Sequence, residues 1–102
     1  MEYLTVLITA PNEDEAAKIA TALVTERLAK CVNIIRNIRS IYEWQGNIED
    51  QSEVLMIAKT KKEIFNKLSE RVKSLHSYEV PEVVALPIVD GLPDYLNWLG
   101  SL

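Results

Sequence analysis

The sequence predicts an α+β fold whose elements follow the order strand, helix, strand, strand, helix, strand, with a short helix at the end. Segments rich in β-branched and aromatic residues alternate with segments whose apolar residues recur at helical spacing. The 102 residues are 48% hydrophobic and 25% charged, which is an ordinary composition for a folded protein of this size. We therefore treat residues 1–102 as a single domain.

The first strand is predicted over residues 3–9, because this stretch is mostly apolar and rich in β-branched residues, as central strands are. Pro11 ends the strand, and Asn12 is placed to cap a helix predicted over residues 13–30. Glu15 follows the cap by three residues, which is a variant of the capping box. The apolar stripe of this helix consists of Ala16, Ile19, Ala20, Leu23 and Leu28.

A long β-hairpin is predicted next. The phase of the apolar residues changes within residues 35–39, which predicts a bulge or bend there. Gly46 and Asn47 both tolerate positive φ, so we expect the turn at these two residues. The strand after the turn contains the apolar run 54–58 and is expected to be covered on both faces. Strands of this length extend past the core of a small domain, so another subunit is expected to cover them.

The remaining elements complete a known arrangement. Thr60 and Glu63 have the spacing of a capping box before a helix predicted over residues 61–75. A last strand is predicted over residues 83–89, and Pro87 within it favours an edge position or an early end. A short helix is predicted over residues 94–99. The order is that of the split βαβ, or ferredoxin-like, sandwich, in which two helices cover one face of a four-stranded antiparallel sheet. The other face then needs a cover.

Composition limits the possible functions. The net charge is −4 and the isoelectric point is about 5.0, which argues against nucleic acid or an anionic membrane as partner. The single cysteine, Cys31, cannot form an intrachain disulfide and fits a reducing cytosol, and we interpret it as an inert buried thiol rather than a reactive one. We see no signal peptide and no membrane-spanning run, so a cytoplasmic location is expected. We find no motif for phosphate, dinucleotide, zinc-protease or serine-hydrolase chemistry, and therefore predict neither an enzyme nor an organic cofactor.

Several segments carry a more specific signal through their order and spacing, namely residues 9–12, 29–34, 40–46, 48–49, 53, 59–60, 76–82 and 95–99. Together they resemble the CutA divalent-cation-tolerance family over nearly the whole chain. The resemblance implies a ferredoxin-like protomer in a tight homotrimer that is similar in architecture to the PII signalling proteins. It also implies a cytoplasmic location and a link to copper and other divalent metals.

The candidate metal ligands are His76, Glu79 and Glu82. A neutral imidazole is a good ligand for copper or zinc, and the resemblance implies that His76 belongs to a His-x-Tyr-x-x-Pro-Glu signature with proposed copper ligands. Leu75 and Ile8 stand where some members carry a histidine and a thiol, so a closed site would need Glu79, Glu82 or a neighbouring subunit. The alternative is that His76 completes a helix C-terminus and that both glutamates belong to a solvated turn.

Tyr42, Trp44, Lys59 and Tyr78 are expected at a cleft or interface between subunits. We interpret the three aromatic residues first as anchors that pack the interface and second as the lining of a pocket. Lys59 can pair with a carboxylate such as Glu82 across subunits, bind an anion, or extend its ammonium group into solvent.

Three functions remain open. The first is a trimeric cytosolic protein of divalent-metal tolerance with a weak inter-subunit site that involves His76, with Cu²⁺ as one candidate ion. The second is a PII-like sensor or signalling scaffold that binds a small anionic metabolite in the cleft and acts on an unidentified protein partner. The third, an enzyme that uses the same cleft, has the least support.

Overall fold

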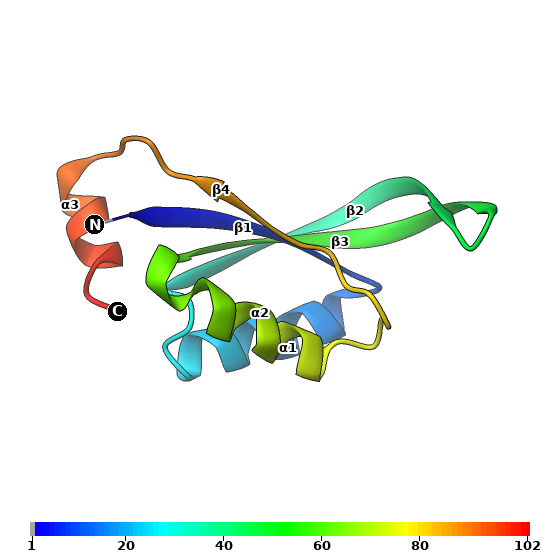
Figure 1. The fold of residues 1–102 in the computed structure, drawn as a ribbon, viewed down its shortest axis with the longest axis horizontal. Coiled ribbons are helices and arrows are strands. Elements are labelled where there is room, and N and C mark those ends of the chain that lie inside the picture. The colour runs from blue at the N-terminus through cyan, green and yellow to red at the C-terminus, as the bar shows by residue number, and fades with distance from the viewer. Residues whose placement is uncertain (1) are drawn as a thin grey trace.

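The computed structural model describes residues 2–102 and confirms the predicted order of elements (Figure 1). Its elements are β1 (Tyr3–Ala10), α1 (Glu13–Thr25), β2 (Cys31–Trp44), β3 (Asn47–Lys61), the 3₁₀ helix η1 (Lys62–Ile64), α2 (Phe65–Leu75), β4 (Val83–Pro87) and α3 (Pro93–Leu99).

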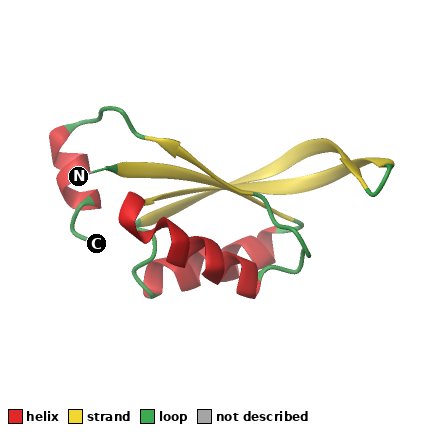
Figure 2. Cartoon of the chain, viewed as in Figure 1, coloured by secondary structure: helices red, strands yellow, loops and turns green. Residues whose placement is uncertain are grey.

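The strands form one antiparallel sheet in the order β2-β3-β1-β4. Helices α1 and α2 lie together against one face of it, and α3 lies beyond one end (Figures 1 and 2). The central place of β1 and the edge position of β4 confirm the prediction. Pro87 is the last residue of β4, so the strand ends two residues earlier than expected, because proline has no N–H to donate to a ladder.

The core lies between the sheet and the two helices. Burial alternates along β1, and the residues that point to the helices are wholly or almost wholly buried. The main contributors are Val6, Ile8, Ile19, Leu23, Met56, Leu68 and Val72. Each large apolar side chain removed from water contributes about 1.5–3 kcal/mol, so this layer provides most of the drive for folding.

The opposite face of the sheet is not covered within one chain. By strand alternation it carries the apolar side chains Leu7, Ile35, Leu55, Ile57, Val84 and Leu86. We call these six residues the open apolar face. The prediction that the run 54–58 is covered on both faces therefore holds for only one face within the protomer, where Val54, Met56 and Ala58 are buried.

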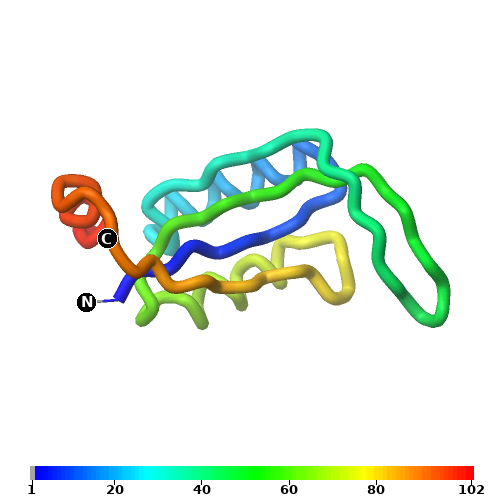
Figure 3. The backbone as a smooth tube through the Cα atoms, turned by 90° about the horizontal axis from the view of Figure 1, so that it is seen from above, coloured from blue at the N-terminus to red at the C-terminus, as the bar shows by residue number. Residues whose placement is uncertain are grey.

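The hairpin of β2 and β3 extends far past the helices (Figures 1 and 3). Residues 47–53 of β3 pair only with β2, because β1 pairs with β3 from Val54 onwards. The chain therefore measures 44 × 24 × 22 Å, and Ile48 near the tip is 75% exposed. An exposed strand pair with apolar side chains is what the sequence led us to expect.

One detail of the hairpin confirms the prediction, and another corrects it. The register shifts between Ile35 and Ile38, as expected, and Asn37 has a φ of 61°. The turn consists of Gln45 and Gly46, with φ of 51° and 82°, so our assignment to Gly46 and Asn47 was one residue too late. Asn47 instead begins β3 as the partner of Trp44, and the Gly46 N–H donates to Glu43 Oε1 at 2.7 Å.

Helix α1 ends at Thr25, five residues before the predicted end. Arg27 has a φ of 59°, and the Leu28 N–H donates to the Leu23 carbonyl at 2.8 Å, which is the pattern of a Schellman stop. Leu28 keeps helical spacing in the sequence but packs on the core from the loop after the helix. Apolar spacing alone did not reveal this end because the left-handed residue is not glycine.

The predicted capping box of Thr60 and Glu63 does not form. Thr60 lies inside β3, where its hydroxyl is wholly buried and donates to the Leu28 carbonyl at 2.7 Å. The chain then turns through η1, and α2 begins at Phe65 without a side-chain cap. At Asn12 the cap is present, since Oδ1 accepts from the Glu15 N–H at 2.8 Å.

Among residues 2–102, no helix combines the length and the apolar content that crossing a bilayer requires.

Candidate functional site

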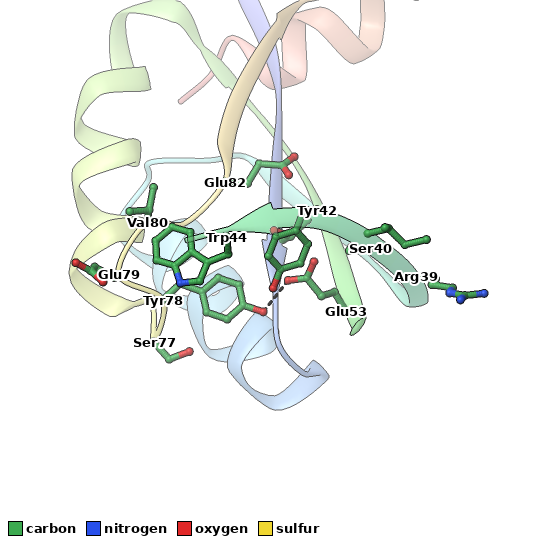
Figure 4. A pocket seen from close by; sticks show the side chains of 12 residues that line it. Arg39, Ser40, Tyr42, Trp44, Glu53, Ser77, Tyr78, Glu79, Val80 and Glu82 are labelled. Carbon is green, nitrogen blue, oxygen red and sulfur yellow. Dashed lines mark hydrogen bonds between the residues drawn. The ribbon is translucent and has the colours of Figure 1, made fainter. Parts of the chain in front are cut away.

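A groove of about 860 Å³ lies between the hairpin of β2 and β3 and the segment 77–82 that leads into β4 (Figure 4). The hairpin contributes Tyr42, Trp44 and Glu53 to its lining, and the segment contributes Tyr78, Glu79 and Glu82. A volume of this size is typical of sites for small molecules.

Glu53 is the buried acidic group of the groove. It lies opposite Ile38, directly beside the bulge, and is only 6% exposed. The Tyr78 hydroxyl donates to Glu53 Oε2 at 2.6 Å (Figure 4). Burial, and then this carboxylate through its hydrogen bond and its charge, raise the pKa of Tyr78 well above the usual value of 10. Tyr78 therefore remains a neutral donor throughout the physiological pH range.

Tyr42 lies on the same side of the hairpin. Desolvation first, and then the charges of Glu53 and Glu49, raise the pKa of Tyr42. Its hydroxyl donates to Gln51 Oε1 at 3.1 Å. Two phenols and one indole thus surround a carboxylate, and Figure 4 shows the three rings around the same hollow as Glu53.

His76 does not line the groove but contacts Tyr78, which does. It is the C-cap residue of α2, with a wholly buried side chain. Nδ1 accepts from the Tyr78 N–H at 3.0 Å, and Nε2 lies 2.7 Å from the Thr9 carbonyl. A carbonyl only accepts, so these partners assign the proton to Nε2 of a neutral ring. This matches the alternative in which His76 completes the helix end, although through hydrogen bonds rather than through a cationic ring.

Glu15 connects this assembly to the first helix. Its Oε2 accepts from the N–H and the hydroxyl of Ser77, both at 2.9 Å, and lies 3.4 Å from His76 Nδ1. The carboxylate is thereby withdrawn from its own helix, so the reciprocal half of the predicted capping box is absent. The starts of α1 and of segment 77–82 are held together instead.

The structure brings together five of the seven predicted site residues. Tyr42, Trp44, Tyr78, Glu79 and Glu82 all line the groove. His76 is connected to it through Tyr78.

Lys59 lies elsewhere. It is on the open side of the sheet, where its Cα partners are Thr5 and Cys31 and its ammonium group donates to Asn33 Oδ1. The Cys31 thiol also contacts Asn33 Oδ1, at 3.8 Å, and is partly exposed rather than buried as expected. A contact of Lys59 with Glu82 is not present within one protomer.

Within residues 2–102, no three His, Cys, Asp or Glu residues are grouped closely enough to hold a metal ion. His76 offers no free ring nitrogen, because both accept or donate within the chain. A metal bound at His76 would have to displace the Tyr78 N–H or the Thr9 carbonyl. Glu79 and Glu82 are the predicted ligands that face the groove directly.

Sequence reasoning assigned no role to Glu53, Thr9 or Ser77 beyond their places in the resemblance. One signal was present, since Glu53 directly precedes the buried run 54–58 and a carboxylate at such a position needs a partner. Thr9 contributes its backbone carbonyl, and Ser77 contributes its backbone N–H as well as its hydroxyl. Backbone groups leave no mark in the sequence.

Comparison with known proteins identifies the family. The family described as CutA1 divalent ion tolerance protein matches residues 4–101. The chain belongs to this family. It is 56% identical over 94 residues to the divalent-cation tolerance protein CutA of Thermus thermophilus, covering 92% of this chain and 91% of that protein. It is 54% identical over 95 residues to the mouse protein CutA, but spans about half of that longer chain (54%) and 93% of its own length.

Solved structures agree with the fold. A Thermus thermophilus divalent cation tolerance protein superposes with a TM-score of 0.93 at 55% identity, covering 95% of this chain and 94% of that one. CutA1 of Oryza sativa gives a TM-score of 0.96 at 40% identity, covering 99% and 93%. The ferredoxin-like class is therefore confirmed. These relatives are named for divalent-cation tolerance rather than for a reaction, in agreement with the prediction of a non-enzymatic protein.

Relatives of this chain are described with different cellular locations. A relative from Arabidopsis thaliana, 46% identical over 98 residues and covering 96% of this chain and 54% of that protein, is described as chloroplastic. A structure from Archaeoglobus fulgidus, with a TM-score of 0.94, 41% identity and coverage of 97% and 96%, is described as periplasmic. Those descriptions apply to those proteins.

Proposed function

We propose that this protein is a cytosolic homotrimer that acts in divalent-cation tolerance by weakly binding divalent ions, copper among them, at sites that two subunits complete. The observation that carries the proposal is the protruding hairpin together with the open apolar face. One protomer leaves both without a cover, and a shared sheet would bury them.

Carboxylates support the groove as the site of the proposed ion. Glu53, Glu79 and Glu82 line it, and the guanidinium of Arg39 at its rim is already paired with Asp50 at 2.6 and 2.9 Å. The groove therefore favours positive charge. Glu79 and Glu82 supply oxygen ligands, and a neighbouring subunit supplies the remainder. His76 joins them when its Nδ1 is released from the Tyr78 N–H.

Light scattering tests the assembly. At micromolar concentration we expect a mass three times the 11.6 kDa of one chain. A mass of one chain would contradict the proposal, and so would a stable dimer.

Calorimetric titration tests the ion site. We expect the variant Glu79→Gln/Glu82→Gln to bind Zn²⁺ at least tenfold more weakly than wild type, and Glu70→Gln, an exposed glutamate on α2, to bind it equally well. Cu²⁺ is titrated beside Zn²⁺, because Cu²⁺ binds most nitrogen and oxygen sites tightly and discriminates poorly. Equal Zn²⁺ affinity in all three proteins would remove both glutamates from the site. Equal affinity in His76→Ala would remove His76.

A second candidate function is a sensor or signalling scaffold that binds a small molecule in this groove and acts on an unidentified protein partner. The volume and the three aromatic rings support it. The carboxylates favour a cationic molecule over the anionic metabolite expected from the sequence. A thermal-shift screen with cationic and anionic compounds tests it, and stabilisation by anions alone would contradict the charge argument.

A further inference from the structure

We propose that the groove beside Glu53 binds an organic cation with a primary ammonium group, which enters between Tyr42, Trp44 and Tyr78 and donates to the Glu53 carboxylate. This site shares the groove with the divalent-ion ligands Glu79 and Glu82, but its main acceptor is Glu53. The proposal rests on the sensor function described above and specifies the kind of molecule that such a sensor would detect.

Glu53 has one carboxylate oxygen that is not used as an acceptor in the described part of the chain. The Tyr78 hydroxyl occupies Oε2, whereas no hydrogen bond among residues 2–102 uses Oε1. In the same part of the chain, no wholly buried side-chain nitrogen or oxygen lacks a partner. Oε1 is therefore accessible from the groove that Glu53 lines. A carboxylate that is 94% withdrawn from water and has a free oxygen attracts a donor with a positive charge, because burial strengthens the attraction.

Three aromatic rings form the walls of the groove around Glu53. The faces of aromatic rings attract cations within about 6 Å, most strongly when the cation is partly removed from water. Tyr42 and Trp44 are each 38% exposed within one protomer, and Tyr78 is fixed by its bond to Glu53. Figure 4 shows these rings and the carboxylate around one hollow. Aromatic walls with an acidic floor fit an alkylammonium ion in both shape and charge.

A primary ammonium ion fits this lining better than a metal ion, a quaternary ammonium ion or an anion does. A divalent metal needs several oxygen or nitrogen ligands and gains nothing from indole or phenol rings. A quaternary ammonium ion has no N–H for Glu53 Oε1. An anion would face Glu53, Glu79 and Glu82 together. A primary ammonium ion uses both the rings and the free oxygen, and a second ammonium group on the same molecule would reach the carboxylates of Glu79 and Glu82 along the groove.

Calorimetry on the full chain, treated with EDTA to remove metal, tests the proposal with butane-1,4-diamine, butylamine and neutral 1-butanol. We expect the diamine to bind more tightly than butylamine and 1-butanol to give no binding heat. Glu53→Gln should weaken diamine binding at least tenfold, because the floor loses its charge. The matched control Glu70→Gln should bind as wild type does. No binding of either amine by wild type, or equal weakening by both variants, would overturn the proposal.

Trp44→Leu provides a second measurement that does not depend on a buried group. Trp44 is half-exposed at the end of β2, so the fold should survive, as far-UV circular dichroism can verify. We expect diamine affinity to fall three- to tenfold, and unchanged affinity would remove the ring from the site. Zn²⁺ titrations of Glu53→Gln and Trp44→Leu separate the amine proposal from the divalent-ion proposal. We expect both variants to bind the diamine more weakly and to bind Zn²⁺ as wild type does. Loss of both ligands together with equal severity would overturn a separate amine site.

Discussion

At the scale of single residues, the hydrogen bond from Tyr78 to Glu53 is the contact that holds the groove together. It joins the segment after α2 to the base of the hairpin across 25 residues of sequence. A buried carboxylate without a donor would be costly, because the charge has lost most of its water. The same bond orients a ring of the groove, so structure and ligand binding depend on one side chain.

We predict that Tyr78→Phe lowers the free energy of unfolding by about 1–3 kcal/mol, because Glu53 loses its buried donor. Tyr42→Phe is the matched control, since that hydroxyl binds Gln51 at an exposed position, and should change stability by less than about 0.5 kcal/mol. Chemical denaturation of both variants at the same protein concentration measures the difference. Equal stability of the two would show that the bond to Glu53 is not the stronger one.

The ion pair on the hairpin gives a pH prediction. Hydrogen bonds from Arg39 lower the pKa of Asp50 below its usual value of 3.8. A depressed pKa in the folded state means that the stabilisation is present above pH 3.8 and is lost as the pH falls through the folded value.

NMR titration of the Asp50 carboxyl should therefore show a midpoint below 3.8 in wild type and a higher midpoint in Arg39→Gln. An identical Asp50 midpoint in both proteins would show that the pair does not persist in solution.

At the scale of elements, the bulge in β2 decides where the hairpin bends. Arg36 and Asn37 together oppose the single residue Val54, and Asn37 adopts a left-handed conformation that most side chains avoid. The bend coincides with the point where β3 leaves β1, and Glu53 is the first residue beyond it. The bulge thus places Glu53 over the groove.

We predict that Asn37→Val destabilises the protein by about 1–2 kcal/mol, because a β-branched residue is strained at this φ. Asn37→Gly should be neutral within about 0.5 kcal/mol, because glycine adopts a positive φ without strain. Thermal unfolding of the two variants at equal concentration measures this contrast. If valine and glycine were equivalent, the left-handed bulge would not exist in solution.

At the scale of the whole molecule, the two faces of the sheet have different roles. One face packs on α1 and α2 and forms the core, and the other presents the open apolar face beside a hairpin that pairs only with itself. A monomer seldom leaves so much apolar surface in contact with water. The same surface would be ordinary in a subunit whose sheet continues into its neighbours.

We predict that Leu86→Glu lowers the mass measured by light scattering to that of one chain, because Leu86 belongs to the open apolar face. Val24→Glu is the matched control: it has similar exposure, 43% against 49%, but lies on α1 on the helix side of the sheet. The control should keep the mass of wild type. Dissociation by Val24→Glu alone would place the subunit interface on the helices instead.

The predictable part of this structure follows from local rules. The alternation of β1, the cap at Asn12 and the phase change before Ile38 are each written within a few residues, so the sequence indicated them correctly. Two of the errors arose where a distant contact overrode a local pattern. Thr60 has the spacing of a cap but instead donates to the Leu28 carbonyl, and Glu15 leaves its own helix for Ser77.

The sequence by itself determined the order of the elements, the family and five of the residues that line the groove, because apolar periodicity and turn chemistry are local and the motif spacing is specific. Only the tertiary structure decided that His76 is a buried neutral support, that Lys59 lies away from the groove, and that Glu53 is its acidic floor. These roles depend on partners 25 to 67 residues away along the chain, and only folding brings such partners within hydrogen-bonding distance.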